Sequence, residues 1–352
     1  MKVLVGMSGG VDSSVAAARL RAAGHEVIGV TMRLWGGESD SGCCSVGDVD
    51  DARRAAQQLG IDHLVFNFSE DFDRHVVEPY VAAHAAGRTP NPCIECNRHL
   101  KFDRLAERAE LLGFDAVATG HHARIVERAG RLALCRSVDR AKDQSYVLHM
   151  LDQRQLARTL FPIGEMTKAA VRAEAARLGL RTATKPDSQD VCFITSTGGR
   201  EAFLGSRIPL RPATVRDREG ATLGSVDAVE LVTVGQRRGL QLAGSPRRRY
   251  VVDIDHRSAV VTVGEERDLL VGDVALEQVC WVDGPVGGPV LAQCSAHGAV
   301  QRGEFDASRA VLRWDEPQRI VAAGQSIVLY DLTDDTVLGG GIARPRSSPA
   351  SA

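Results

Sequence analysis

Three features are scarce in this sequence of 352 residues. Aromatic residues make up only 5% of it, the formal net charge is only −2, and long hydrophobic runs are missing. The near-neutral charge gives no chain-wide signal for nucleic acid, so any basic surface must be local. No apolar run approaches the roughly 20 residues that span a bilayer or forms a signal-peptide core, which predicts a cytoplasmic protein without a membrane partner.

The composition is otherwise that of a globular protein, with 44% hydrophobic and 25% charged residues. Its length exceeds what one hydrophobic core usually holds, so two or three domains are expected. The chain also has eight cysteines. A reducing compartment disfavours structural disulfides, so these cysteines call for a chemical or a packing explanation.

The first part of the chain alternates short apolar runs with helical patterns. Strands are expected at 3–7, 27–32, 64–68 and 116–119, and helices at 12–23, 50–59, 99–112 and 167–178. A glycine suited to a left-handed C-cap follows each of these helices. The alternation predicts an α/β domain over residues 1–197, with a parallel sheet covered on both faces.

Short β-like runs and turn residues dominate the rest of the chain. They predict a small β-rich domain over residues 198–269, including a hairpin within 250–263, and a small β-barrel over 270–345. Residues 346–352 are expected to form a disordered tail.

A glycine-rich loop joins the first expected strand to the first helix. It reads Ser-Gly-Gly-Val-Asp-Ser-Ser from Ser8 to Ser14. The glycines let backbone N–H groups approach a polyanion, and the helix N-terminus adds a favourable dipole. The lysine of a Walker A loop and the spacing of a dinucleotide fold are both missing. The pattern therefore predicts a PP-loop, which binds pyrophosphate, and an enzyme that cleaves ATP.

The predicted ATP contacts lie in this loop and at its two ends. They are Gly6, Met7, Ser8, Gly9, Gly10, Val11, Asp12 and Ser13. The Asp12 carboxylate could hold Mg²⁺ against the phosphates, or it could only favour the helix N-terminus.

Three cysteines lie in polar loops among prolines, asparagines and carboxylates: Cys93, Cys96 and Cys192. Those surroundings indicate reactive thiols. Cys135 and Cys280 lie in β-like runs, where a small buried hydrophobe is the simpler interpretation.

Six motifs in order make the chain resemble the tRNA-specific 2-thiouridylases over nearly its whole length. They occupy residues 6–13, 89–97, 118–121, 142–146, 187–194 and 235–240. The resemblance implies an N-terminal domain of the adenine nucleotide α-hydrolase type. It also implies ATP-dependent adenylation of the C2 carbonyl of the wobble uridine in tRNA, followed by sulfur transfer that gives 2-thiouridine, AMP and pyrophosphate.

The resemblance also implies roles for individual residues. Cys96 matches the nucleophile and Cys192 the persulfide carrier, which a sulfur-relay protein or a cysteine desulfurase would load. Met32 and Gly120 match further ATP contacts. The positions that match contacts to the target base and to the tRNA are Asn91, Pro92 and Cys93, and then Lys142, Asp143 and Gln144.

The positive charge gathers in the middle of the chain. Residues 200–257 hold 11 arginines against 7 acidic residues, a net charge of +4. Arg237 and Arg238 form one of the densest groups and are expected to contact tRNA phosphates, the alternative being a solvated arginine-rich face. In the third domain the resembling family carries a basic and aromatic pair, whereas residues 297–302 here include no aromatic.

Several alternatives stay open at the level of sequence. Cys93, Cys96 and Cys192 could instead ligate a [4Fe-4S] cluster whose open iron holds the sulfur. The chain could be another PP-loop enzyme that adenylates a small molecule, or an RNA-binding module with a degenerate nucleotide site. If the cysteines act as thiolates, the cations near them in sequence are Arg98, Lys101, His121 and Lys185.

Overall fold

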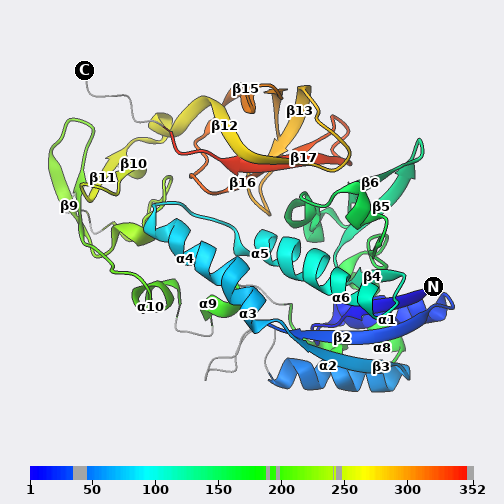
Figure 1. The fold of residues 1–352 in the computed structure, drawn as a ribbon. Coiled ribbons are helices and arrows are strands. Elements are labelled where there is room, and N and C mark those ends of the chain that lie inside the picture. Colours follow the sequence, from blue (N-terminus) through cyan, green and yellow to red (C-terminus); the bar gives the residue numbers. More distant parts are fainter. Residues whose placement is uncertain (35–45, 188–190, 196–198, 241, 243–247, 347–352) are drawn as a thin grey trace.

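The computed structural model describes residues 1–34, 46–187, 191–195, 199–240, 242 and 248–346, and of Cys192 it describes only the backbone. These residues form an α/β part, a four-stranded sheet and a closed barrel, which confirms the predicted fold class (Figure 1). The domain boundaries placed after 197 and 269 stay predictions, and most of the expected tail lies outside the described residues. None of the described helices is both long and apolar enough to cross a membrane.

The N-terminal sheet is parallel throughout and has the strand order β3-β2-β1-β4-β7. Its strands are β1 (Lys2–Gly6), β2 (Glu26–Arg33), β3 (Asp62–Asn67), β4 (Ala116–Thr119) and β7 (Thr159–Leu160). The four expected strands are confirmed to within two residues. Successive side chains of a strand point to opposite faces, so Val3 and Val5 enter one hydrophobic cluster and Leu4 enters another.

Helices cover both faces of this sheet. One face packs on α1 (Val11–Ala22), α2 (Val46–Leu59) and α8 (Lys168–Arg177). The other packs on α3 (Ser69–Phe72), α4 (Glu78–Ala85), α6 (Leu105–Leu111), α9 (Cys192–Thr195) and α10 (Arg200–Gly205). The short helix α5 (Pro92–Glu95) places Ile94 in a separate cluster. Helical segments of π type, Asp73–Val77 and Cys96–Arg104, join α3 to α4 and α5 to α6. The helix expected at 99–112 is therefore part of a longer helical run that begins at Pro92.

A hairpin that the sequence analysis missed follows the fourth strand. It consists of β5 (Ala123–Arg128) and β6 (Arg131–Arg136) and forms a separate two-stranded sheet. Ala129 and Gly130 make its turn with φ of 51° and 76°. Two successive positive φ values characterise a tight hairpin turn whose twist matches that of the strands.

The remaining strands build the two β parts. The middle sheet has the order β10-β11-β8-β9, from β8 (Ala213–Arg216), β9 (Thr222–Val226), β10 (Tyr250–Asp255) and β11 (Val260–Gly264). Antiparallel pairing of β10 with β11 confirms the expected hairpin. The barrel closes as β12-β15-β14-β13-β16-β17, from β12 (Leu270–Trp281), β13 (Gly288–Gln293), β14 (Gln301–Asp306), β15 (Val311–Arg319), β16 (Ser326–Tyr330) and β17 (Val337–Ala343).

The barrel packs directly on the N-terminal part. One hydrophobic cluster joins Leu134 and Tyr146 of the N-terminal part to Val328 and Tyr330 of the barrel. In Figure 1 the barrel lies above α5 and beside the β5–β6 hairpin, while the middle sheet lies beside α4 and α10. Ile94 of α5 belongs to the cluster shared with the barrel, so the barrel packs on the start of the helical run at Pro92. Between the β5–β6 hairpin and β7, the chain forms the short helix α7 (Gln153–Leu156).

Candidate active site

The PP-loop is a compact turn held by its own serines. Strand β1 ends at Gly6 and α1 starts at Val11. The Ser13 hydroxyl accepts a hydrogen bond from the Ser8 N–H and donates one to the Gly10 carbonyl, both at 3.2 Å. Gly9 has a φ of 71°, and a Cβ there would lie 2.4 Å from the Asp48 carbonyl oxygen. Only glycine fits at position 9. The loop leads directly into the N-terminus of α1, which is suited to phosphate binding.

The other predicted ATP contacts flank this loop on the neighbouring strands. Met32 lies on β2 and Gly120 follows β4, and β1 runs between those two strands. A Cβ on Gly120 would lie 2.6 Å from the Ser13 nitrogen, so the chain after β4 contacts the first turn of α1. The carboxyl ends of parallel strands meet at one edge, which is where open α/β sheets bind ligands.

The Asp12 carboxylate is engaged by two basic side chains. Lys168 Nζ lies 2.8 and 2.7 Å from its two oxygens, and His122 Nε2 donates to Oδ1 at 3.2 Å. Burial alone would raise the pKa of Asp12, but the hydrogen bonds and charges of His122 and Lys168 hold that pKa below its ordinary value. A Mg²⁺ ion at Asp12 would therefore share this carboxylate with the lysine or displace it.

Lys168 also reaches the segment that leads to Cys192. Its Nζ lies 2.8 Å from Asp187 Oδ1. Asp187 accepts further charged hydrogen bonds from Lys142 at 2.8 Å and Arg172 at 2.7 Å. Burial raises the pKa of Asp187, yet the lysine contacts outweigh it and lower that pKa strongly. The sequence predicts the helix at 167–178 but gives no local signal that distinguishes Lys168 as a residue of the site.

The candidate cations for thiolate activation are mostly committed elsewhere. Lys185 lies 2.7 Å from both Asp48 and Asp51, which ties the same segment to α2. His121 is buried next to the Thr119 hydroxyl, and burial lowers its pKa well below the ordinary value. His121 is therefore neutral at neutral pH and does not supply the positive charge considered for it.

The segment around Cys96 starts a helical run. The Asn91 side chain caps it by accepting the Cys93 N–H at 3.1 Å, and Pro92 takes the first helical position. Cys96 is half-buried and begins the π-type segment. Windings of this type occur often at functional sites. The barrel also contacts the chain three residues before Pro92, because the Thr89 N–H donates to the Ala323 carbonyl at 2.8 Å.

The segments that carry Cys96 and Cys192 meet in one hydrophobic cluster. Cys96 packs on that cluster together with Val191 and Ile194. Phe193 is 2% exposed and forms edge contacts with Phe72 and Tyr80, at ring-centroid distances of 5.6 and 5.5 Å. The backbone of Cys192 thus lies in a helix packed on the cluster that Cys96 contacts. Its side chain lies outside the described residues, so the pairing of the two thiols stays a prediction.

Three other cysteines pack as hydrophobes. Burial raises the pKa values of Cys135 and Cys280, and it raises the pKa of Cys294 to about 12. Their thiols are therefore protonated at neutral pH, in keeping with the packing interpretation of the first two.

No group of three or more His, Cys, Asp or Glu residues in the described part of the chain could hold a metal. The set Cys93, Cys96 and Cys192 is not tested, since one of its side chains lies outside that part.

The three residues of the predicted tRNA-contacting triplet all make contacts within the protein, although Gln144 is exposed and the Lys142 side chain is 41% exposed. Asp143 is only 5% exposed and pairs with Arg136, while Lys142 pairs with Asp187. The Gln144 side-chain oxygen accepts the His122 N–H at 2.9 Å. A tRNA contact by Lys142 or Gln144 would therefore compete with contacts inside the site.

The predicted arginine pair lies on the surface of the middle part. Arg237 and Arg238 are exposed in a loop after the short helical turn Val229–Leu231. Gln236 shapes this loop, since its side-chain amide donates to the Arg238 carbonyl at 2.8 Å. The guanidinium groups are therefore presented to solvent, as phosphate contacts would require.

Comparisons with known proteins agree with the three-part architecture. A family model described as tRNA methyl transferase HUP domain matches residues 1–196. Models described as tRNA methyl transferase PRC-barrel domain and Aminomethyltransferase beta-barrel domain match residues 201–265 and 296–343. Among solved structures, a 4-thiouridine synthetase and RNA complex with bound ATP matches 56% of this chain and 46% of its own at TM-score 0.36 and 19% identity, too distant to carry an argument.

Curated relatives match nearly the full length. A protein of Mycobacteroides abscessus named tRNA-specific 2-thiouridylase MnmA is 47% identical over 357 aligned residues, covering 97% of this chain and 99% of its own. A protein of the same name from Thermobifida fusca is 47% identical and covers 96% and 94%. With its PP-loop, its cysteine-bearing segments and its closed barrel, this chain belongs to the family of tRNA-specific 2-thiouridylases.

Proposed function

We propose that this enzyme thiolates C2 of the wobble uridine in tRNA, with ATP as the activator and a persulfide on Cys192 as the sulfur donor. One observation carries the proposal. Lys168 joins the PP-loop acid Asp12 to Asp187, at the start of the segment that bears Cys192, and that segment packs in the cluster that Cys96 contacts. Activation and sulfur delivery would thus meet in one place.

The charge around the PP-loop suits ATP. Asp12 and Asp187 face the three cations Lys142, Lys168 and Arg172, so the group carries a net positive charge. Fixed positive groups near the phosphates would stabilise the pyrophosphate that leaves when AMP is transferred to the uracil oxygen. A Mg²⁺ ion bound at Asp12 would neutralise further phosphate charge. The chain's own part is to hold the triphosphate at the N-terminus of α1.

The sulfur step then follows from the two thiols. The terminal sulfur of the Cys192 persulfide attacks C2, the new C–S bond forms, and the C–O bond to AMP breaks. The Cys96 thiolate attacks the Cys192 sulfur, which frees the thiolated base and leaves a disulfide between the two cysteines. A cellular thiol reductant opens that disulfide, and a cysteine desulfurase or sulfur-relay protein reloads Cys192. We place these steps in the cytoplasm, where such reductants are abundant.

The exposed arginines of the middle part support tRNA as the substrate. Arg237 and Arg238 would contact phosphates without reading sequence, so binding should weaken as salt rises. The hydrogen bond from the Cys93 N–H to the Asn91 side chain and the burial of Pro92 give the proposed base-contacting segment a fixed backbone.

A reconstituted reaction tests the proposal. Purified enzyme is mixed with unmodified tRNA, ATP, Mg²⁺ and a cysteine desulfurase with cysteine, and nucleosides, AMP and pyrophosphate are quantified. We expect 2-thiouridine, AMP and pyrophosphate in equal amounts, and no 2-thiouridine from Cys192→Ser. Full product formation by Cys192→Ser would refute the persulfide step. Iron and sulfide measured in anaerobically purified enzyme at one cluster per chain would favour the [4Fe-4S] version instead.

A further inference from the structure

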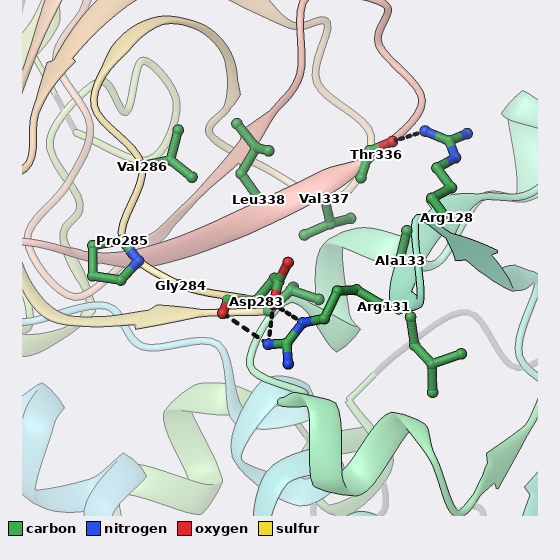
Figure 2. A pocket seen from close by; sticks show the side chains of 12 residues that line it. Arg128, Arg131, Ala133, Asp283, Gly284, Pro285, Val286, Thr336, Val337 and Leu338 are labelled. Atoms are coloured by element: carbon green, nitrogen blue, oxygen red, sulfur yellow. Dashed lines mark hydrogen bonds and ion pairs between the residues drawn. The ribbon is translucent and has the colours of Figure 1, made fainter.

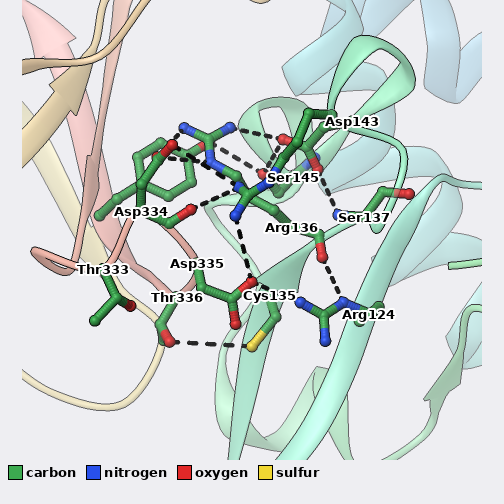
Figure 3. Close-up of polar contacts among 12 residues, drawn as sticks. Arg124, Cys135, Arg136, Ser137, Asp143, Ser145, Thr333, Asp334, Asp335 and Thr336 are labelled. Carbon is green, nitrogen blue, oxygen red and sulfur yellow. Dashed lines mark hydrogen bonds and ion pairs between the residues drawn. The ribbon is translucent and has the colours of Figure 1, made fainter. Parts of the chain in front are cut away.

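A buried arginine joins the β5–β6 hairpin to the barrel. Arg136 is the last residue of β6, and its side chain is 7% exposed. Its guanidinium donates to Asp334 of the barrel at 2.9 Å (Figure 3). It also donates to Gln293 at 2.9 Å and lies 3.7 Å from the centroid of the Tyr330 ring. Three barrel residues therefore fix the plane of one guanidinium group.

The same guanidinium holds the triplet 142–144. Arg136 Nη1 donates to Asp143 Oδ2 at 2.7 Å (Figure 3). Asp143 also accepts the Ser137 N–H at 2.9 Å and the Ser145 hydroxyl at 2.7 Å, so its carboxylate has one fixed position. The residues on either side of Asp143 are thereby fixed as well.

Those two neighbours reach the ATP site. Lys142 pairs with Asp187 at 2.8 Å. Gln144 makes two hydrogen bonds with the backbone of His122. The Gln144 N–H donates to the His122 carbonyl at 2.8 Å, and the Gln144 side-chain oxygen accepts the His122 N–H at 2.9 Å. His122 in turn donates to Asp12. A continuous series of polar contacts thus runs from the barrel to the PP-loop acid.

We propose that Arg136 is a positioning residue through which the barrel fixes Asp12 and Asp187, so that the barrel is part of the ATP-activating half of the enzyme. The proposal rests on the proposed function. It assigns the barrel a task besides any contact with tRNA. Small displacements of groups in an active site cost much of the rate, so the accuracy of this series should matter for AMP transfer.

The same interface contains a matched control. Arg131 pairs with Asp283 of the barrel at the edge of a cavity of about 420 Å³ (Figure 2). Arg128 pairs with Asp335 beside it at 2.9 Å. None of the contacts that the structure records for Arg131 reaches the triplet or His122. Loss of the Arg131 pair should loosen the interface without moving the site.

The test compares Arg136→Lys, Asp334→Asn and Arg131→Met in the full chain. Lysine keeps the charge at 136 but cannot make the planar fork, and Asp334 is 38% exposed, so both variants should fold. We expect kcat for tRNA-dependent AMP release to fall about tenfold in Arg136→Lys and less in Asp334→Asn, with the KM for tRNA unchanged. Arg131→Met should keep the wild-type kcat.

A double-mutant cycle on ATP affinity separates this role from general loosening. The Kd of ATP with Mg²⁺ is measured without tRNA for Asp334→Asn, Gln144→Met and the double variant. Residues in one series of contacts do not contribute independently, so the double variant should bind ATP only slightly more weakly than the weaker-binding single variant. The losses in ATP binding free energy from Arg131→Met and Gln144→Met, in contrast, should add.

Two results would overturn the proposal. One is additive losses of ATP affinity in Asp334→Asn and Gln144→Met, and the other is a loss of kcat in Arg131→Met as large as that in Arg136→Lys. A wild-type enzyme that binds ATP but makes no 2-thiouridine would refute the proposed function instead, and the ATP cycle would still decide the role of Arg136.

Discussion

The two halves of the site are held by different forces. Around the PP-loop, Asp12 and Lys168 are fixed by charged hydrogen bonds of 2.7 to 2.8 Å, and Gly9 by backbone contact. The proposed sulfur-transfer half, which comprises the segments of Cys96 and Cys192, relies on the apolar cluster that contains Phe193 and contacts Cys96. Charged hydrogen bonds specify direction, whereas apolar packing does not. Under the proposed mechanism, this difference means that ATP activation would need preset geometry, whereas the two cysteine segments would need only to be brought together.

The variant expected to separate the two halves most clearly is Cys96→Ser. A hydroxyl cannot open the persulfide bond, so we expect 2-thiouridine formation to fall by about 1,000-fold or more, while the Kd of ATP stays unchanged. Nucleoside analysis and calorimetry measure the two quantities. Cys294→Ala, which removes a thiol that burial keeps protonated, is the control. A parallel loss of ATP affinity in Cys96→Ser would show that the halves are not separate.

Lys168→Met should damage the opposite half. Asp12 and Asp187 would lose the cation that they share, and a fixed positive group near the phosphates would be gone. We expect kcat for AMP release to fall about 100-fold, measured with radiolabelled ATP. Arg177→Met is the matched control, because Arg177 lies on the same helix and its ion pair among the described residues is with Glu174 at the surface. Wild-type AMP release by Lys168→Met would contradict the account of this half.

The packing of the sulfur half is tested by Phe193→Leu. The smaller side chain should lower the free energy of unfolding by about 1 to 2 kcal/mol and loosen the link between the two cysteine segments. AMP release should then exceed 2-thiouridine formation severalfold. Phe114→Leu, in the same cluster just before β4, should lower stability similarly without this uncoupling. If both variants keep equal amounts of AMP and 2-thiouridine, the packing of Phe193 does not matter for sulfur delivery.

The smallest effect concerns pH. The pKa of Asp187 is lowered in the folded protein, so its stabilising contribution is complete above the unfolded pKa of about 3.9 and is lost as pH falls through the folded pKa. The stability deficit of Asp187→Asn should therefore be constant from pH 5 to 8 and shrink below pH 4. Urea titrations at each pH measure it. A deficit that changes between pH 5 and 8 would point to another titrating group.

Local patterns predicted the parts of the molecule that depend on local chemistry. The PP-loop, its flanking strand and helix, and the hairpin within 250–263 follow from glycine positions and from periodicity. The turn at Ala129 and Gly130 also had a sequence signal, because runs that alternate apolar and polar residues flank it at 123–128 and 131–136. The arginines in these runs obscured that alternation.

Contacts between distant segments could not be predicted in the same way. Lys168 lies 156 residues from Asp12, and nothing around it distinguishes it from a surface lysine on a capped helix. Arg136 and Asp334 are 198 residues apart, and their meeting depends on how the barrel packs on the hairpin. Asp143 matched a tRNA-contacting position, yet its burial could be seen only in the folded chain.

The central claim is tested most directly by the nucleosides of tRNA from cells that lack this protein. The account predicts that 2-thiouridine at the wobble position disappears, that the wild-type gene restores it, and that Cys96→Ser and Lys168→Met do not. Wobble 2-thiouridine that persists at its normal level in the deleted cells would contradict the account.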